Sequence, residues 1–276
     1  MTSSIFSIGV DLGGTWIRLE AVDAQARRVR SLKAPAPPLS QLPAFLKRRL
    51  HAWKVRPPYL IVASRGVWTR PERSHLKRAL RALAHHVTVM SDVEAAWHAA
   101  FGRPSPHPSP QGRGRKGEGI VVISGTGSIA YGSDASGRSK RAGGLGPLVG
   151  DEGSAFWIGK EWLKRNRGEA AKPSHQTVRR IAALAPRVLN LARKGNPLAR
   201  ELVNEAQQHL SDLVVQAAGR LHFRNRVPVS WGGSLLNNPA FRAGFLRALR
   251  RRGRRYRISP PRLSPVSAIA GLPVSS

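Results

Sequence analysis

Three short segments rich in glycine and hydroxyl side chains each follow an apolar run that is typical of a β-strand. They read Asp11-Leu12-Gly13-Gly14-Thr15, Ser124-Gly125-Thr126-Gly127-Ser128 and Trp231-Gly232-Gly233-Ser234. Successive backbone amides in such a glycine turn form an anion-binding concavity, and the missing side chains let a ligand approach closely. We therefore expect the first two segments to bind phosphate and the third to lie against a flat adenosine. An ordinary hairpin turn is the alternative explanation of the first segment taken alone.

Carboxylates are the next candidates, because they are scarce in this chain. There are 46 Lys and Arg residues but only 15 Asp and Glu residues. Asp11 ends the first apolar run, where it suits a hydrated Mg²⁺ ion beside the phosphates. Asp92 follows the run Val87–Met90 and is the candidate general base, since strand ends in α/β folds deliver catalytic groups. Helix capping is the alternative explanation of Asp92.

The stretch from Gly143 to Gly159, GGLGPLVGDEGSAFWIG, is the most specific in the chain. We expect Asp151 and Glu152 to begin a helix after its glycine-rich loop. A carboxylate there suits recognition of sugar hydroxyls, while attraction to the helix dipole is the simpler explanation. Gly159-Lys160 resembles the end of a P-loop, but the glycine spacing differs and Glu161 stands where Ser or Thr is required. We therefore expect no P-loop.

The elements that must position these residues form two halves joined by a Pro/Arg/Gly-rich segment, 103–118, which we expect to be a loop or linker. In the first half, 1–102, we expect strands at Ser4–Val10, Trp16–Val22, Arg28–Lys33, Tyr59–Ala63 and Val87–Met90, and helices at Leu39–Trp53, Pro71–Ala84 and Val93–Phe101. In the second, 119–276, we expect strands at Gly119–Ser124, Ile129–Gly132, Val227–Trp231 and Tyr256–Ser259, and helices at Glu152–Asn166, Ser174–Ala185, Ala185–Arg193, Pro197–Phe223 and Pro239–Arg251. Each half begins strand, glycine turn, strand, which indicates two related α/β lobes.

Composition adds a basic character and excludes several kinds of site. The formal net charge is +31, which alone would indicate a polyanion such as nucleic acid as partner. Arg247–Arg257 and Arg70–Arg81 are the candidate surfaces for that alternative, and a solvated arginine-rich surface is the simpler explanation. The chain has no cysteine. Disulfides, thiolate zinc sites, a cysteine nucleophile and a cysteine-held iron–sulfur cluster are therefore excluded.

Targeting signals are also missing from the sequence pattern. The first residues lack a basic region, and Gly9 and Asp11 break the apolar run that follows, so we expect no signal peptide. No run of about eighteen apolar residues predicts a membrane span. We expect a cytoplasmic protein without a membrane partner, and a homodimer is left open.

Five segments together resemble the BadF/BadG/BcrA/BcrD-type ATPase and N-acetylglucosamine kinase family, part of the actin-like/hexokinase/Hsp70 ATPase superfamily. In chain order they are DLGGTWIR, SDVEAAWHAAF, VISGTGSIAYG, GGLGPLVGDEGSAFWIG and SWGGSLLNNPAFRAGF. The resemblance runs from residue 6 to about residue 272 and leaves out the Pro/Arg-rich loop. It implies two RNase H-like lobes with ATP and Mg²⁺ in a cleft between them.

The resemblance also implies roles for individual residues. Asp11 would sit near the metal and Asp92 would act as base towards a sugar hydroxyl. Gly144 and Asp151 would contact the sugar. The phosphates would meet Gly13, Gly14, Thr15, Gly125, Thr126, Gly127 and Ser128, and the adenosine would meet Gly232, Gly233 and Ser234.

Departures from the family pattern concern the sugar rather than the nucleotide. Leu145 stands where family kinases usually carry Trp, Ile129 where the animal enzymes have Asn, and no Asn precedes Asn166. The sequence predicts an ATP-dependent sugar kinase of the N-acetylglucosamine kinase type, active in carbohydrate metabolism. The alternatives are a BadF/BadG-type ATPase or regulatory ATP-binding protein without sugar kinase activity, and a basic nucleic-acid-binding protein. The electron-transfer role of the name-giving members needs a cysteine-held cluster, which this chain cannot supply alone.

Overall fold

The computed structural model describes residues 5–102, 117–147, 149–168, 175–224, 226–253 and 255–272. The chain divides into two compact units, one of Met1–Arg115 with Arg262–Ser276 and one of Lys116–Pro261. Most of the expected linker, residues 103–116, lies outside the described residues. Within the described part of the chain, no helix has the length and apolar character that crossing a membrane requires.

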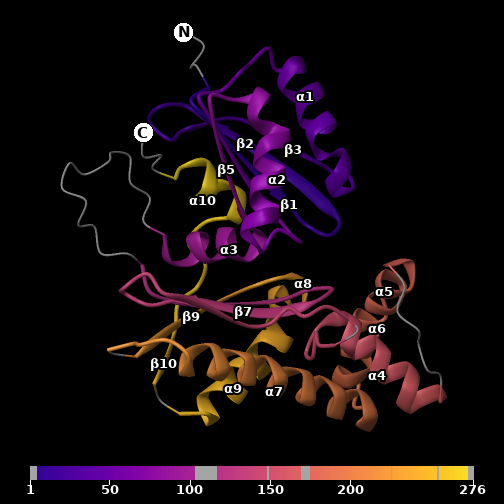
Figure 1. The fold of residues 1–276 in the computed structure, drawn as a ribbon. Coiled ribbons are helices and arrows are strands. Elements are labelled where there is room, and N and C mark those ends of the chain that lie inside the picture. The colour runs from indigo at the N-terminus through magenta and orange to yellow at the C-terminus, as the bar shows by residue number, and fades with distance from the viewer. Residues whose placement is uncertain are drawn as a thin grey trace. The chain divides into compact units, whose positions relative to one another are not determined.

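The first unit is a mixed sheet between layers of helices (Figure 1). Its strands are β1 (Ser7–Leu12), β2 (Trp16–Val22), β3 (Arg28–Pro35), β4 (Tyr59–Ser64) and β5 (His86–Ser91). Its helices are η1 (Leu39–Gln41), α1 (Leu42–Ala52), α2 (Arg70–Leu80), η2 (Arg81–Leu83), α3 (Asp92–Phe101) and α10 (Pro265–Ala270). The strand order is β3-β2-β1-β4-β5, in which β1, β4 and β5 pair in parallel and β2 pairs antiparallel with both of its neighbours, β1 and β3.

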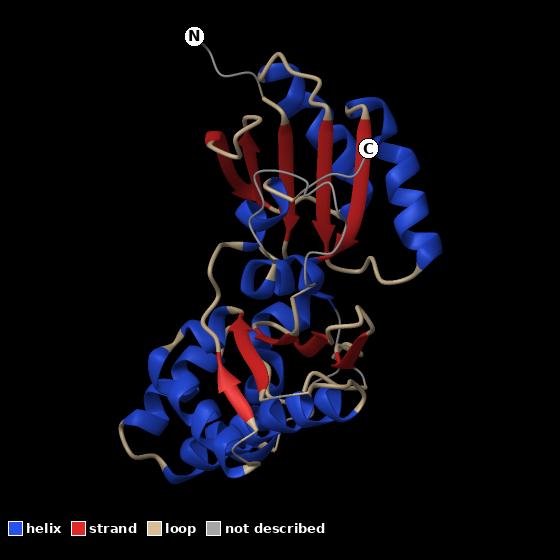
Figure 2. Ribbon diagram, turned by 90° about the vertical axis from the view of Figure 1, so that its left-hand side faces the viewer, coloured by secondary structure: helices blue, strands red, loops and turns tan. Residues whose placement is uncertain are grey.

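Helices cover both faces of this sheet because its central strands are apolar on both sides (Figure 2). One face packs Ile8, Val10 and Val62 against leucines of α1 and α2. The other packs Ile61 with Ile269 of α10 and with α3. The sheet core is therefore fully enclosed, and its edges and strand ends remain for function.

The C-terminal helix α10 packs directly on β1 of the first unit. A Cβ atom built on Gly9 would lie 2.7 Å from the carbonyl oxygen of Val266 and 2.8 Å from the amide nitrogen of Ala270. Glycine therefore permits a close backbone approach at this point. The sequence had assigned residues up to 276 to the second lobe and predicted no helix after the final strand, so the division of the chain differs there.

The second unit contains a second five-stranded sheet and the longest helix of the described residues, α7. Its strands are β6 (Gly119–Ser124), β7 (Ser128–Ser133), β8 (Ser139–Gly143), β9 (Val227–Gly232) and β10 (Tyr256–Ile258). Its helices are α4 (Ala155–Arg167), α5 (His175–Ala182), α6 (Ala185–Arg193), α7 (Pro197–Gly219), α8 (Ser234–Asn237) and α9 (Pro239–Arg251). The order β10-β9-β6-β7-β8 places β6 at the centre, parallel to β9 and antiparallel to β7. The long helix α7 packs on β6, β7 and β8 and buries Leu210 and Val214 against that core.

One expected helix begins later than the sequence predicted. Asp151 and Gly153 have φ angles of 65° and 79°, which an α-helix does not allow. The side chain of Ser154 then caps α4 by accepting a hydrogen bond from the amide of Trp157. Asp151 and Glu152 therefore precede the helix, and the expected start at Glu152 is wrong.

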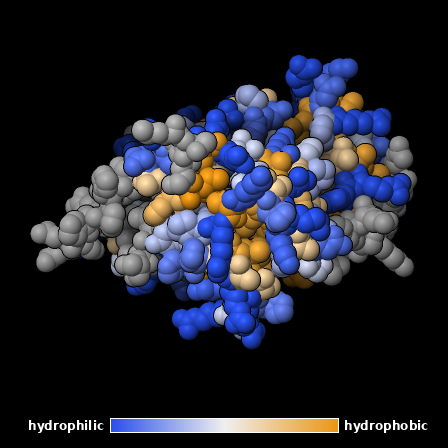
Figure 3. Space-filling model, turned by 90° about the horizontal axis from the view of Figure 1, so that it is seen from above, coloured by the Kyte–Doolittle hydropathy of each residue, from blue (hydrophilic) through white to orange (hydrophobic). Residues whose placement is uncertain are grey.

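Other differences are small. β8 and the short helix α8 were not predicted, and α7 ends at Gly219 rather than at Phe223. The predicted start of α5, Ser174, lies outside the described residues. Hydrophilic side chains cover most of the face seen in Figure 3, with a smaller apolar area between them, as the basic composition leads one to expect.

Candidate functional site

In the first unit, the candidate residues meet where three parallel strands end. Leu12 of β1 pairs with Ser64 of β4, and Ser64 pairs with Ser91 of β5. The residues that follow each of these three are Gly13, Arg65 and Asp92. Because the strands end in register, the first glycine turn, Arg65 and the candidate base all lie at the carboxyl ends of these three strands, along one edge of the sheet.

The turn between β1 and β2 is a tight hairpin. The amide of Gly13 donates to the carbonyl oxygen of Trp16 at 3.0 Å, and the amide of Ala36 donates to the carbonyl oxygen of Thr15 at 2.9 Å. These bonds fix the turn, while the Thr15 side chain is exposed. The geometry agrees with an ordinary hairpin that also presents a hydroxyl and glycine backbone to a ligand.

Asp92 does not cap the helix that it begins. Ser91 does so, because its side chain accepts from the amide of Glu94 at 3.3 Å while the Glu94 carboxylate accepts from the amide of Ser91 at 2.8 Å. Asp92 is left as the first helical residue, and its Oδ1 accepts from the neighbouring Val93 amide at 2.9 Å. Helix capping therefore does not explain the carboxylate of Asp92, because Ser91 caps this helix.

Two carboxylates influence each other at this edge. Burial, and then the negative charge of Asp11, raise the pKa of Asp92 to about 6, against the opposing effects of the Val93 amide and the Arg65 charge. Burial also raises the pKa of Asp11, which the nearby Arg18 guanidinium partly offsets. A carboxyl group with a pKa near neutrality is well suited to accept a proton in catalysis.

Asp11 is the carboxylate that fits a magnesium ion. Its side chain is buried, and its recorded partner, Nη1 of Arg18, lies 3.5 Å from Oδ2, which is a long ion pair. Among the described residues, no group of three or more His, Cys, Asp or Glu side chains forms a metal site. Mg²⁺ usually takes one or two carboxylates together with waters and substrate phosphates. The residues present therefore fit that mode of binding and not an all-protein cage.

In the second unit, the start of α4 holds the second glycine turn. The amide of Gly125 donates to the carbonyl oxygen of Gly127 at 2.9 Å, which closes the turn. The amides of Ala155 and Phe156 donate to the carbonyl oxygens of Gly125 and Thr126 at 2.8 Å and 3.3 Å. These helical amides therefore position the turn, and the side chain of Thr126 stays exposed.

Asp151 lies against that turn. Its Oδ1 accepts from the amide of Ser128 at 3.3 Å, and a Cβ atom built on Gly127 would lie 3.0 Å from both carboxylate oxygens. Burial raises the pKa of Asp151. The hydroxyl of Ser128 donates to the carbonyl oxygen of Glu152 at 2.7 Å, and Ser128 is 2% exposed. Ser128 thus ties the turn to the Asp151 loop from within.

Gly144 joins the same cluster. Its amide donates to the carbonyl oxygen of Ser128 at 2.9 Å, its φ is +70°, and a Cβ atom there would lie 2.6 Å from Cδ1 of Ile129. Only glycine fits this combination of backbone angle and close contact. Beyond it, Leu145 and Val149 are 60% and 71% exposed.

The third glycine segment packs on the second. Gly233 has a φ of +89°, and a Cβ atom there would collide with the backbone of Ser124. A Cβ atom on Gly125 would lie 3.7 Å from Oγ of Ser234, whose side chain is exposed. The two segments therefore form one continuous backbone surface.

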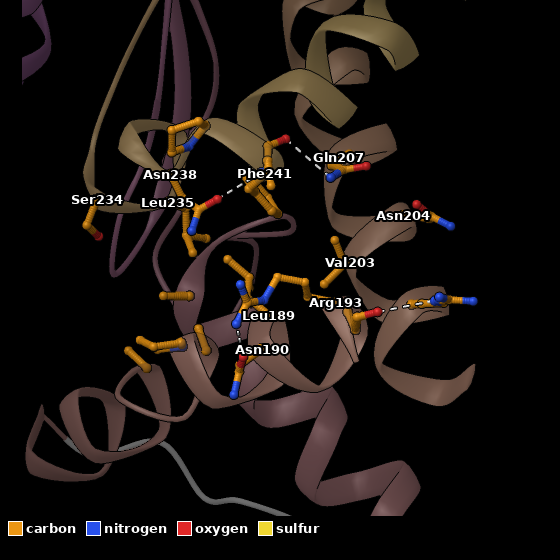
Figure 4. Close-up of a pocket in the computed structure, with 18 of the residues that line it drawn as sticks. Leu189, Asn190, Arg193, Val203, Asn204, Gln207, Ser234, Leu235, Asn238 and Phe241 are labelled. Atoms are coloured by element: carbon orange, nitrogen blue, oxygen red, sulfur yellow. Dashed lines mark hydrogen bonds between the residues drawn. The ribbon is translucent and has the colours of Figure 1, made fainter. Parts of the chain in front are cut away.

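A cavity of about 860 Å³ opens beside Ser234. Figure 4 shows Ser234 and Asn238 on one side of it, Val203, Asn204 and Gln207 on the other, and Leu189 and Asn190 below them in this view. Arg193, Arg200 and Arg247 also line it, and none of the described residues in its lining carries a carboxylate. The cavity thus combines apolar walls with positive charge.

Within each unit, the structure brings the predicted residues together. Asp11, Gly13, Gly14, Thr15 and Asp92 share one edge of the first sheet, and Gly125, Thr126, Gly127, Ser128, Gly144, Asp151, Gly232, Gly233 and Ser234 form one cluster in the second unit. Arg65 and the cavity were not predicted from the sequence. The position of Arg65 directly after a strand was the available signal, whereas the cavity residues are scattered over several helices and gave none.

The sequence profile of the BadF/BadG/BcrA/BcrD ATPase family matches residues 110–271. The chain belongs to this family. An N-acetylmuramic acid/N-acetylglucosamine kinase of Clostridium acetobutylicum is 30% identical over 211 residues, which cover 65% of this chain and 64% of that protein. An N-acetyl-D-glucosamine kinase of Dictyostelium discoideum is 29% identical over 125 residues, which cover 35% of this chain and 39% of that protein. The chain thus spans less than two thirds of the length of these relatives.

A candidate N-acetylglucosamine kinase of known structure, from Porphyromonas gingivalis, shares the fold of this family member. The TM-score is 0.72 at 18% identity, and the match covers 96% of this chain and 97% of that one. This likeness confirms the predicted fold class, an α/β fold with two lobes, each built here on a five-stranded sheet.

Proposed function

We propose that this protein transfers the terminal phosphoryl group of ATP to a hydroxyl group of an amino sugar of the N-acetylglucosamine class. The observation that carries the proposal is the shared strand edge of the first unit, which holds a glycine turn and two buried or partly buried carboxylates. The names of the Clostridium and Dictyostelium relatives supply the sugar class.

Asp92 is the proposed base. The attacking sugar oxygen forms a bond to the terminal phosphorus, and the bond from that phosphorus to the bridging oxygen breaks with its electron pair staying on ADP. The sugar hydroxyl proton passes to the carboxylate of Asp92, whose pKa, raised to about 6 by burial and by Asp11, leaves it ionised yet basic at neutral pH. Enzymes of this kind act mainly by aligning groups and neutralising charge.

Each unit, taken by itself, offers candidate nucleotide contacts. In the first, Gly13, Gly14 and Thr15 bind phosphate and Asp11 holds Mg²⁺, which when bound supplies neutralisation of phosphate charge. In the second, Gly125, Thr126 and Gly127 bind phosphate. The segment Gly232–Ser234 borders the adenosine, which the adjoining 860 Å³ cavity is large enough to receive.

The sugar contacts are proposed from the Asp151 cluster. The carboxylate of Asp151 lies beside Gly127, and its oxygens accept hydrogen bonds from sugar hydroxyls. Gly144 joins the cluster through its amide bond to the carbonyl oxygen of Ser128. Ser128 is assigned a supporting role, since its hydroxyl and amide are both bonded within the protein.

The test is release of ADP from Mg–ATP over a panel of N-acetylglucosamine, N-acetylmuramic acid, glucose and no sugar. Wild type is expected to release ADP with at least one amino sugar, and Asp92→Asn to lose about two to four orders of magnitude in rate, the usual contribution of a general base. Asp212→Asn is the matched control, because Asp212 is an exposed carboxylate that pairs with Arg252 in the second unit. Equal ADP release by wild type and Asp92→Asn with every sugar contradicts the proposal. ATP binding without sugar-stimulated release supports the regulatory alternative instead.

A further inference from the structure

The Arg65 side chain carries a positive charge close to both the first glycine turn and the proposed base, Asp92. It follows β4 directly, between Gly13 after β1 and Asp92 after β5, because these three strands end in register. The amide of Arg65 donates to the carbonyl oxygen of Leu12 at 3.4 Å, which ties its backbone to the strand that leads into the turn.

The Arg65 side chain reaches back over the turn. A Cβ atom built on Gly14 would lie 3.4 Å from Nη1 of Arg65, so the guanidinium borders the space that a side chain at Gly14 would occupy. Its charge also acts on Asp92. Arg65 itself is exposed at the sheet edge, and no ion pair to a carboxylate within 4.0 Å is recorded for it among the described residues. The guanidinium is thus available to an incoming ligand.

We propose that Arg65 binds the terminal phosphate of the nucleotide held at the Gly13–Thr15 turn and stabilises the charge on that phosphoryl group as it is transferred. This inference rests on the proposed function. A guanidinium suits the task because its fixed fork of N–H donors matches phosphate oxygens in a bidentate manner. Its place beside Asp92 sets it next to the hydroxyl that attacks, where the transferred group must lie.

The neighbouring arginine does not compete for this role. Arg18 pairs with Asp11 across the β1–β2 register, so its charge is already engaged by the proposed magnesium ligand. Arg65, in contrast, forms no ion pair within 4.0 Å among the described residues, so its guanidinium can bind phosphate.

The first experiment measures binding of Mg–ATP and Mg–ADP by calorimetry to wild type, Arg65→Gln, Arg65→Lys and Arg48→Gln. Arg48 is an exposed arginine of α1 and controls for the loss of one positive charge from a very basic protein. Arg65→Gln is expected to weaken ATP binding about 10- to 100-fold, as loss of a charged hydrogen bond does, while ADP binding changes less than about threefold. Arg65→Lys should recover part of the loss, and Arg48→Gln should change neither nucleotide.

A second measurement uses the sugar that wild type phosphorylates. Arg65→Gln should lower kcat by at least about 100-fold and leave KM for the sugar unchanged, because the charge it stabilises develops on the phosphoryl group. Loss of ATP and ADP binding by the same factor, or of neither, overturns the inference. So does a change confined to KM for an acidic sugar such as N-acetylmuramic acid, which would assign Arg65 to the sugar's carboxylate. Wild type that binds ATP but phosphorylates no sugar contradicts the proposed function alone, since the ATP-to-ADP ratio still tests Arg65.

Discussion

Replacing Asp92 by Asn is expected to stabilise the first unit at neutral pH while it removes the proposed base. The carboxylate is held in a place that disfavours its charge, through burial and the nearby charge of Asp11. Asn has nearly the same shape, and its side-chain oxygen still accepts the hydrogen bond from the Val93 amide. The substitution therefore removes the charge and little else.

The magnitude follows from the pKa. The pKa of Asp92 is raised from 3.8 to about 6, and one pKa unit corresponds to about 1.4 kcal/mol. The full difference is about 3 kcal/mol, and because part of Asp92 still meets solvent we expect about 1–3 kcal/mol at pH 8. Since the pKa is raised by folding, the folded state prefers the protonated carboxyl. The penalty in wild type is thus absent below pH 3.8, grows as the pH rises to about 6, and is complete above about pH 7.

Native-state hydrogen exchange of β5 and α3 at several pH values between about 4.5 and 8 measures this stability locally. A local probe is needed because two units need not unfold together. The control is Asp212→Asn in the second unit, which should leave β5 and α3 unchanged at every pH. Burial of charge is refuted as the cause if Asp92→Asn is no more stable than wild type at pH 8. The same explanation is refuted if the stability difference between Asp92→Asn and wild type is equal at pH 4.5 and pH 8.

The remaining predictions concern the same sites. The acid limb of the kcat/KM pH profile should report an apparent pKa of about 6 for Asp92, with activity lost as the carboxylate is protonated below it. Asp11→Asn should lower the pKa of Asp92 in a carboxyl-resolved NMR titration without Mg²⁺, because the charge of Asp11 raises that pKa; an unchanged pKa would contradict the coupling. Gly233→Ala should lower the thermal stability of the second unit by roughly 2–4 kcal/mol, since its φ is +89° and a Cβ atom collides with Ser124. Gly219→Ala, at the end of α7 with nothing within 4 Å of its Cβ position, is the control and should cost nothing; equal losses in calorimetric melting would refute the steric argument.

Local patterns were enough to predict that strands lead into the glycine turns, although β1 ends at Leu12 rather than at the expected Val10. Asp11 with its hairpin, and Ser124 with the turn after it, depend on residues adjacent in the chain, where the apolar run and the glycines carry the signal. The capping of α3 by Ser91 was also within reach, because Glu94 stands three residues later, as a capping box requires.

Features that depend on distant contacts could not be predicted in this way. The position of Arg65 beside the base follows from the parallel pairing of β1, β4 and β5, which no local pattern encodes. The late start of α4 depends on the left-handed backbone at Asp151, a conformation that is uncommon in residues other than glycine. The cavity beside Ser234 arises from the packing of helices whose lining residues share no sequence spacing.

The packing of α10 on β1 sets the order in which a nascent chain can complete its two units. Residues 117–261 leave the ribosome as one continuous stretch, so the second unit has all its parts before the first does. The first unit is complete only after Pro265–Ala270 has been made and covers β1, the strand that carries Asp11. Until then, the face of β1 around Gly9 lacks the helix that packs on it. Domains generally fold as units during synthesis. Here the half that is translated first is the half that is finished last.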